Sequence, residues 1–311
     1  MKKITTAFIV ALLSFELTLA ADENCYKKMN LLSPETAPRE VTLALVQYPI
    51  VGQLSLDSFK AKVETYVKKA KAKQANLVIF PELFIADMLD TAEKKSPLTE
   101  QFDHFVKNVT PVLIDFIKDL AKKHNVAVLG GTFPRRVNGK IYNSALLAFE
   151  DGRHEFQDKN YLTPDEVAWG WSAAKNINIV NSPFGKLVIL ICYDVEFAKV
   201  SNQLSKDAPE IFIVPSMTDT IEGFRRVRWT AQARAIEHRA YVVHTGTVGT
   251  PDPSWPNWGQ ASFVTPSEKG FPGVLKEGRV NRDDVLIEKL DLKLLRQARH
   301  KKGIYPACDQ L

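Results

Sequence analysis

Short apolar runs recur along the chain and predict strands that are buried inside the protein. Most of their residues are β-branched or aliphatic, and most runs end at a polar residue, a glycine or a proline. This pattern is typical of strands that are covered on both faces, because no position then has to face water. The runs occupy residues 42–46, 76–80, 126–129, 145–149, 187–191, 211–214 and 241–243.

Four segments between these runs have the periodicity of helices, with apolar residues at every third or fourth position or, in the last segment, a high content of alanine and arginine. They cover residues 59–70, 102–120, 197–204 and 221–238. Pro111 lies inside the second segment, where we expect it to break or kink the helix because proline cannot donate a backbone hydrogen bond. Strands that alternate with helices, without an internal linker or repeat, predict a single layered α/β domain.

The first 20 residues have the pattern of a cleaved signal peptide. Two lysines precede an apolar run over residues 4–15, and small residues follow at the two positions that signal peptidase reads. A retained N-terminal anchor is the alternative, but the run is short for a membrane span and Glu16 interrupts it. Residues 21–40 are polar and are expected to form an irregular leader, which leaves residues 41–311 for the domain and a C-terminal tail.

Composition and charge narrow the class of protein. No later stretch approaches the roughly 20 apolar residues of a membrane span, so we expect a soluble protein in the periplasm or outside the cell. With 45% hydrophobic and 25% charged residues, the chain is neither a disordered protein nor a small disulfide scaffold. The formal net charge of +5 comes from scattered lysine pairs, which indicate solvated helix faces and no nucleic-acid partner.

Three cysteines are an odd number for an exported protein. Cys25 and Cys308 lie near the two ends of the mature chain and could pair in an oxidising compartment, although the sequence does not give their distance. Cys192 would then be the remaining thiol. It follows an apolar run, so a strand end would hold its Cβ while the next turn exposes the sulfur, as in a nucleophile. A buried structural thiol is the alternative for this cysteine considered alone.

Three other side chains would complement a nucleophilic thiol. Glu82 follows the run at 76–80, and Lys159 and Glu166 lie on either side of a polar turn. Because reactive residues of layered α/β folds gather at the carboxyl ends of strands, these side chains could converge. Glu82 could take the proton of the thiol, while Lys159 and the backbone N–H of Tyr193 could stabilise negative charge that develops on the substrate. Glu166 could orient Lys159 or position the attacking water.

These residues stand in motifs that resemble those of the nitrilase (carbon–nitrogen hydrolase) superfamily, over roughly residues 41–290. The resemblance implies a four-layer αββα sandwich that usually assembles through helices into homodimers or larger homo-oligomers. It also implies a catalytic Glu–Lys–Cys set at Glu82, Lys159 and Cys192, with Glu166 as the additional family glutamate. The matching motifs are Phe80-Pro81-Glu82-Leu83, the segment from Lys159 to Glu166, Ile191-Cys192-Tyr193-Asp194, and the segments 214–220, 226–237 and 246–249.

The resemblance implies hydrolysis of a carbon–nitrogen bond through a thioester or thioimidate at the cysteine, without a metal or organic cofactor. The sequence is most similar to the amidohydrolase-like branch, so a small, non-peptide amide is the expected substrate. Hydrolysis of a nitrile or an N-carbamoyl group, or acyl transfer, would use the same residues and stays open. A secreted binding protein that keeps the fold without catalysis is the alternative from a different class.

Five further residues are candidates for contact with the substrate. Trp169 and Trp171 follow Glu166 and could form a wall of the acyl pocket or pack in the core. Ser216 and Thr218 follow the run at 211–214, and His244 follows the run at 241–243. A dyad of His244 with Cys192 is an alternative mechanism, and a buried, hydrogen-bonded histidine is the simpler interpretation. The six histidines form no i, i+4 pair and no cluster with cysteine, so no metal site is expected.

Three remaining features have weaker signals. Asn143 and Ser144 precede the run at 145–149 and are expected to serve a turn. Three arginines between residues 225 and 228 are expected to pair on a helix surface or at a subunit interface, although an anionic substrate could also bind them. Residues 251–258 contain three prolines and two tryptophans and are expected to form a loop near the site, where specificity is often set.

Overall fold

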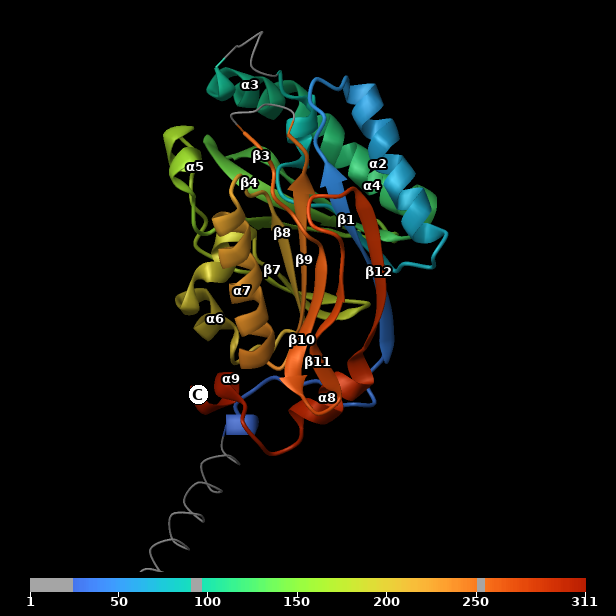
Figure 1. Cartoon of the computed structure of the whole chain (residues 1–311), viewed down its shortest axis with the longest axis vertical. Coiled ribbons are helices and arrows are strands. Elements are labelled where there is room, and N and C mark those ends of the chain that lie inside the picture. The colour runs from blue at the N-terminus through green and yellow to red at the C-terminus, as the bar shows by residue number, and fades with distance from the viewer. Residues whose placement is uncertain (1–24, 91–96, 251–254) are drawn as a thin grey trace, which may run out of the picture.

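The computed structural model of the protein describes residues 25–90, 97–250 and 255–311, and two sheets form its centre (Figure 1). The first sheet has the order β5-β4-β3-β2-β1-β12, with β1 (Glu40–Pro49), β2 (Leu77–Ile79), β3 (Ala127–Val137), β4 (Lys140–Ala148), β5 (His154–Asp158) and β12 (Asp284–Asp291). The second sheet runs from β6 (Ile179–Ser182) through β7 (Gly185–Ile189), β8 (Ile211–Ser216), β9 (Tyr241–Val248) and β10 (Ser262–Glu268) to β11 (Phe271–Glu277). A short parallel pairing of β1 with β9, at Tyr48 and Thr247, joins the two sheets.

Helices cover the outer face of each sheet, which gives the four-layer αββα arrangement (Figure 1). Strand β1 shows the layering, because Leu43 and Leu45 belong to one apolar cluster with strands β7 to β9, whereas Ala44 and Val46 pack with helices α2 and α4. The expected fold class is therefore confirmed. The helices are α2 (Leu56–Lys71), α3 (Leu98–His104), α4 (Thr110–His124), α5 (Pro164–Ala168), α6 (Ala198–Leu204), α7 (Ile221–Glu237), α8 (Leu292–Arg299) and α9 (Pro306–Asp309), together with the 3-10 turns η1 (Phe84–Met88) and η3 (Cys192–Glu196).

All seven apolar runs contribute to strands, and the break at Pro111 is also confirmed. A π-helical turn, η2 (Phe105–Val109), separates α3 from α4, and Pro111 lies in the first turn of α4. Because its nitrogen carries no hydrogen, the regular i to i−4 pattern cannot pass through this point. Strands β5, β6, β11 and β12 were not predicted, because most of their positions are exposed or only partly buried and so form no apolar run. The mostly buried strand β10 was also missed, because Phe263 and Val264 are flanked by serine, threonine and proline.

Strand directions place several loops at the same edge of the sheets. Strands β1, β2 and β3 are mutually parallel, β7, β8 and β9 are mutually parallel, and β1 is parallel to β9. Strand β5 runs in the same direction as β3, since both pair antiparallel with β4. The segments that follow β2, β5, β7 and β8 therefore leave the fold at one end.

The two ends of the described chain lie together. Cys25 and Cys308 form a disulfide with their Cα atoms 5.2 Å apart, inside a small apolar cluster that includes Tyr305. Between Cys25 and β1 the chain is irregular apart from a short helical turn. The predicted signal peptide, residues 1–20, lies outside the described residues. None of the helices in the described ranges is long and apolar enough to cross a membrane.

Candidate active site

The four residues predicted for the site come from three segments at the same end of the sheets. Glu82 follows β2, Lys159 directly follows β5, Cys192 follows β7 and begins η3, and Glu166 belongs to α5 in the segment after Lys159. All four are buried, with at most 4% of each residue exposed. The strand directions thus bring together residues that are up to 110 positions apart in the sequence.

Lys159 bridges the two carboxylates. Its Nζ lies 2.7 Å from Oε1 of Glu82 and 2.9 Å from Oε2 of Glu166. Such a fully buried cation needs ionised partners, because an isolated ammonium would lose its hydration without compensation. The group therefore has two formal negative charges and one positive charge in a site without bulk water.

Asn143 joins the same network, which the sequence interpretation missed. Its Nδ2 donates to Oε1 of Glu82 at 2.9 Å and to Oε1 of Glu166 at 2.7 Å. The expectation that it serves a turn is wrong, because Asn143 lies inside strand β4, opposite Pro134 of β3. The available signal was that asparagine is disfavoured in strands, so its place beside a buried apolar run already indicated a specific polar partner.

A capping box holds Glu166 in place. Thr163 is the N-cap of α5, and its hydroxyl accepts a hydrogen bond from the backbone N–H of Glu166 at 3.4 Å. In return, Oε2 of Glu166 accepts from the backbone N–H of Thr163 at 2.9 Å. The Thr-Pro-Asp-Glu sequence is a known start signal for helices, and here it also fixes the side chain of a site residue.

Cys192 has a strained backbone and an indirect link to Glu82. Its φ is +48°, a conformation that non-glycine residues seldom adopt and that is often found at functional sites. Its Sγ donates to the carbonyl oxygen of Met217 at 3.7 Å, and the N–H of Met217 donates to Oε2 of Glu82 at 2.8 Å. Residue 217, at the end of β8, therefore connects the thiol to the carboxylate.

Asp194 connects the cysteine segment to the lysine segment. Its carboxylate accepts backbone hydrogen bonds from Asn160 at 3.0 Å, Tyr161 at 2.7 Å and Ile191 at 3.1 Å. Burial raises the pKa of Asp194 to about 7, although Lys159 and these hydrogen bonds act in the opposite direction. Asp194 belongs to the quoted Cys-Tyr-Asp motif, but its bracing role depends on a partner segment that the sequence does not reveal.

The protonation states follow from burial and from the three nearby charges. Burial raises the pKa of the Cys192 thiol well above its ordinary value, and the charge of Glu82 adds to this. Burial alone would lower the pKa of Lys159, but the carboxylates of Glu82 and Glu166 outweigh burial and raise it. Burial also raises the pKa of Glu82, against the opposing effect of Lys159. The site therefore holds a neutral thiol and a charged lysine, and a thiolate would form here only with the help of a base.

Comparison with known proteins identifies the family of this chain. The model of the carbon–nitrogen hydrolase family matches residues 42–300. The chain belongs to this family. It is 34% identical over 280 residues to "Probable hydrolase YhcX" of Bacillus subtilis (strain 168). The aligned region covers 87% of this chain and 53% of YhcX, so the chain spans about half the length of that protein. The prediction of a carbon–nitrogen hydrolase is confirmed at the level of the family.

More distant relatives are amidases. The chain is 23% identical over 282 residues to omega-amidase NIT2 of Xenopus tropicalis, over 83% of this chain and 95% of that protein. A double mutant of the amidase from Nesterenkonia sp. AN1, solved in complex with acrylamide, superposes with a TM-score of 0.69 at 17% identity, over 85% of this chain and 96% of the other. This structure shows that the fold is shared.

The two tryptophans lie in an aromatic cluster beside α5. Trp169 and Trp171 contact each other at 5.2 Å between ring centroids, and both contact Phe102 of α3, at 4.9 and 5.0 Å. Trp255, from the predicted loop, lies 6.4 Å from Trp169; residues 251–254 of that loop lie outside the described residues. The rings pack together, and their contact with a substrate stays a prediction.

Of the other three candidates, Ser216 is the last residue of β8, Thr218 follows that strand, and His244 lies within β9. Ser216 is buried, and its hydroxyl has no hydrogen-bond partner among the described residues. The hydroxyl of Thr218 donates to the backbone of Trp258 at 2.6 Å, which ties it to the loop before β10. His244 stacks on Phe224 of α7, and burial together with Arg228 lowers its pKa to about 3. In the described part of the chain no hydrogen bond joins His244 to Cys192, so the alternative dyad has no geometric support.

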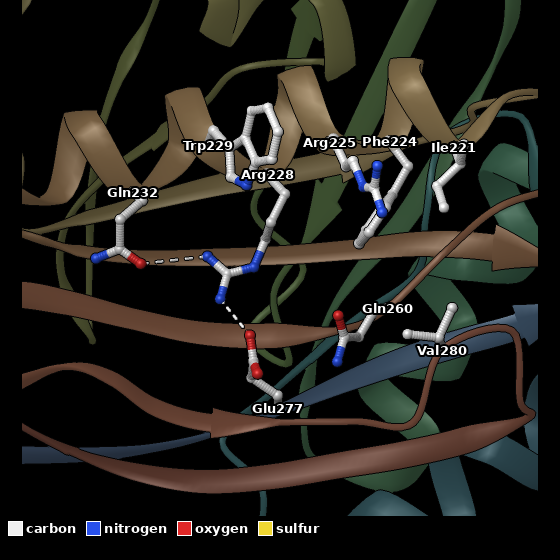
Figure 2. A pocket seen from close by; sticks show the side chains of 9 residues that line it. All are labelled: Ile221, Phe224, Arg225, Arg228, Trp229, Gln232, Gln260, Glu277 and Val280. Atoms are coloured by element: carbon white, nitrogen blue, oxygen red, sulfur yellow. Dashed lines mark hydrogen bonds and ion pairs between the residues drawn. The ribbon is translucent and has the colours of Figure 1, made fainter.

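Helix α7 carries the arginines outside this network. Figure 2 shows Arg228 reaching from α7 to Glu277 and to Gln232, beside a pocket of about 370 Å³ that is also lined by Arg225 and Trp229. Arg226 pairs with Glu196 at 3.2 Å. The expected pairing on a helix surface is thus observed for two of the three. Within residues 25–90, 97–250 and 255–311, no group of three or more histidine, cysteine, aspartate or glutamate side chains could hold a metal ion.

Proposed function

We propose that the protein hydrolyses the carbon–nitrogen bond of a small, non-peptide amide through a thioester on Cys192. The observation that carries this proposal is the single buried network in which Lys159 joins Glu82 to Glu166 and Met217 links Glu82 to the thiol. Acyl transfer uses a nucleophile, a base and a donor that stabilises the oxyanion, and the thiol, the carboxylate and the fixed ammonium can supply these three groups.

In the acylation step, Glu82 takes the proton of Cys192 while Sγ attacks the carbonyl carbon of the amide. Negative charge develops on the carbonyl oxygen, where Lys159 Nζ and the backbone N–H of Tyr193 stabilise it. The carbon–nitrogen bond then breaks, and Glu82 gives the proton to the departing nitrogen, which leaves as ammonia or an amine. The raised pKa of the thiol makes this base necessary, since little thiolate forms without it.

In the deacylation step, a water molecule attacks the thioester. Glu82 accepts a proton from the water, Lys159 again stabilises the oxyanion, and the thiolate leaves and is reprotonated as the acid departs. Glu166 holds Lys159 between the two carboxylates and helps to orient the water. An amide is preferred to a nitrile, an N-carbamoyl group or acyl transfer because the named relatives, omega-amidase NIT2 and the Nesterenkonia enzyme, are amidases.

The experiment is a screen of small primary amides, including the ω-amides of dicarboxylic acids, for release of ammonia. Cys192→Ala should reduce turnover of any active amide to background, because the nucleophile is gone, while the melting temperature stays near that of the wild type. Ser205→Ala removes a buried hydroxyl outside the network and serves as the control with normal activity. Intact mass spectrometry of the wild type during turnover should reveal an acyl group on Cys192. Undiminished turnover by Cys192→Ala would rule out the mechanism.

We also propose that the protein is exported to the periplasm or out of the cell and that it forms a homodimer or a larger homo-oligomer. The disulfide between Cys25 and Cys308 supports an oxidising compartment. On α7, Trp229 is 66% exposed and Ile236 is 44% exposed, an apolar surface that suits contact with a second copy. Cell fractionation and light scattering test these proposals; a cytosolic protein that retains residues 1–20, or a monomeric mass, would contradict them.

A further inference from the structure

One residue outside the predicted Glu–Lys–Cys set contacts both carboxylates that pair with Lys159. The side chain of Asn143 donates to both Glu82 and Glu166, and its backbone carbonyl accepts from the N–H of Lys159 at 2.9 Å. We propose that Asn143 is a positioning residue, whose uncharged amide holds the two carboxylates against Lys159 and leaves Glu82 the negative charge that it needs to take the Cys192 proton. This inference rests on the function proposed above.

The chemistry of the amide fits this task. The NH2 group of asparagine has two hydrogens, and the two carboxylates accept one each. Its orientation is unambiguous, because the amide oxygen would repel two carboxylates. The oxygen, Oδ1, is buried without a hydrogen-bond partner among the described residues. An unpaired buried acceptor is unfavourable, and asparagine is a poor strand former, so stability alone does not explain this residue.

The charge balance explains why the donor should be neutral. Glu82, Glu166 and Lys159 sum to a formal charge of −1, and the neutral thiol of Cys192 adds nothing; Asp194 faces Lys159 from the cysteine segment. A second cation in place of Asn143 would cancel the charge and make Glu82 a weaker base. An apolar residue would leave the two carboxylates with too few hydrogen-bond donors. One carboxylate would then take up a proton at a higher pH than in the wild type.

The test measures the proton affinity of Glu82 and needs no substrate. Cys192 is the one free cysteine of the described residues, so the rate of iodoacetamide labelling, followed by intact mass between pH 4.5 and pH 9, reports on this thiol alone. The acid limb of this profile marks the pH below which Glu82 is protonated and cannot accept the thiol proton. The variants are Asn143→Leu, which removes the donors at similar size, Asn143→Asp, which adds a carboxylate, and Asn143→Ser, which keeps one donor.

We expect the acid limb to move to higher pH in the order wild type, Asn143→Ser, Asn143→Leu, Asn143→Asp. Loss of a hydrogen bond to a charged group corresponds to a shift of about one pH unit, or about tenfold slower labelling on the limb. Thr110→Val is the matched control, because Thr110 is buried and donates to the carbonyl of Pro134, the strand partner of Asn143. It should lower the melting temperature without moving the limb.

An unmoved acid limb in any folded Asn143 variant would overturn the proposal, even if the variant is less stable, because a purely structural role changes stability and not proton affinity. Asn143→Ser keeps the test available if the bulkier variants do not fold. Failure of the proposed function has a different signature. In that case Cys192 of the wild type itself would react at pH 6–7 no faster than a free thiol.

Discussion

Cys192 combines three properties that are uncommon in one residue: a positive φ, nearly complete burial and a raised thiol pKa. Burial alone would make an inert structural cysteine. What distinguishes this one is the hydrogen-bonded path through Met217 to Glu82 and the ammonium of Lys159 nearby. At the scale of single residues, the site is thus a set of charges that are stable only in each other's presence.

Lys159→Met tests that dependence. Removal of one partner from a buried ion pair costs about 3–5 kcal/mol of unfolding free energy. Without the ammonium, the pKa of Glu82, which burial already raises, should rise further. A carboxyl with a higher pKa in the folded state binds more protons when folded, so stability falls as the pH rises above about 4.3, the value in the unfolded chain. Urea unfolding should therefore reveal a larger loss at pH 8 than at pH 5.

The control for this prediction is Lys199→Met, on the exposed side of α6. It should change the unfolding free energy by less than about 0.5 kcal/mol at both pH values. Equal destabilisation of Lys159→Met at pH 5 and pH 8 would mean that its partners do not change protonation, and the electrostatic account of the site would be wrong.

At the scale of elements, short helices and strand ends set the geometry of the site. The carboxyl ends of β2, β5, β7 and β8 share one edge, so their loops meet there. Helix α5 has only five residues, Pro164–Ala168, and its start is defined by the capping box of Thr163 and Glu166. A helix this short has little intrinsic stability, so the cap decides where the Glu166 carboxylate lies.

Thr163→Ala should therefore affect both stability and catalysis. Loss of an N-cap costs about 1 kcal/mol, and we expect hydrolysis of an active amide to slow by about tenfold as Glu166 and Lys159 lose alignment. Ser55→Ala removes the N-cap of α2, where Ser55 accepts from the N–H of Ser58 at 3.2 Å. It should cost similar stability and leave the rate unchanged. Equal rates for the two variants would remove any catalytic role for the capping box.

At the scale of the whole molecule, the two ends of the described chain are held by buried cations and a disulfide. Arg296 of α8 donates to Glu210 at 2.6 Å and to the backbone carbonyl of Pro38 at 2.9 Å. Arg299 donates to four backbone carbonyls, among them that of Ala208 at 3.0 Å. These arginines connect the leader, the C-terminal segment and the loop before β8. The disulfide thus cross-links a region that is already packed. Its two cysteines take no part in the network around Cys192.

The double variant Cys25→Ser/Cys308→Ser should be less stable without losing its reactive thiol. The cross-link joins residues 283 positions apart, and a native disulfide typically contributes 2–5 kcal/mol by restricting the unfolded chain. Unfolding in urea should reveal this loss, while iodoacetamide labelling of Cys192 proceeds at the wild-type rate. In the non-reduced, denatured wild type, a thiol assay should count one thiol. A count of three would contradict the disulfide.

Local patterns in the sequence were sufficient for much of the fold. Every apolar run contributes to a strand, and the π-turn before Pro111 follows from the missing N–H. The edge strands β5, β6, β11 and β12 escaped prediction because they are partly exposed and their apolar pattern is weak. Strand β10 is buried but escaped as well, because polar residues and a proline surround its apolar pair Phe263 and Val264. Hydrophobic periodicity reports burial, so it is clear for central strands and faint at the edges.

The sequence by itself determined the order of the central strands and the main helices, the family, and the identity of Glu82, Lys159, Glu166 and Cys192 as candidates, because motifs and periodicity are local properties. Only the tertiary structure decided which polar residues join them. Asn143 lies 61 positions from Glu82, and Asp194 lies 33 positions from Tyr161, so their roles depend on contacts between distant segments. The tertiary structure also decided the protonation states of the site. A pKa depends on burial and on nearby charges, and the chain buries these groups and brings the charges together only when it folds.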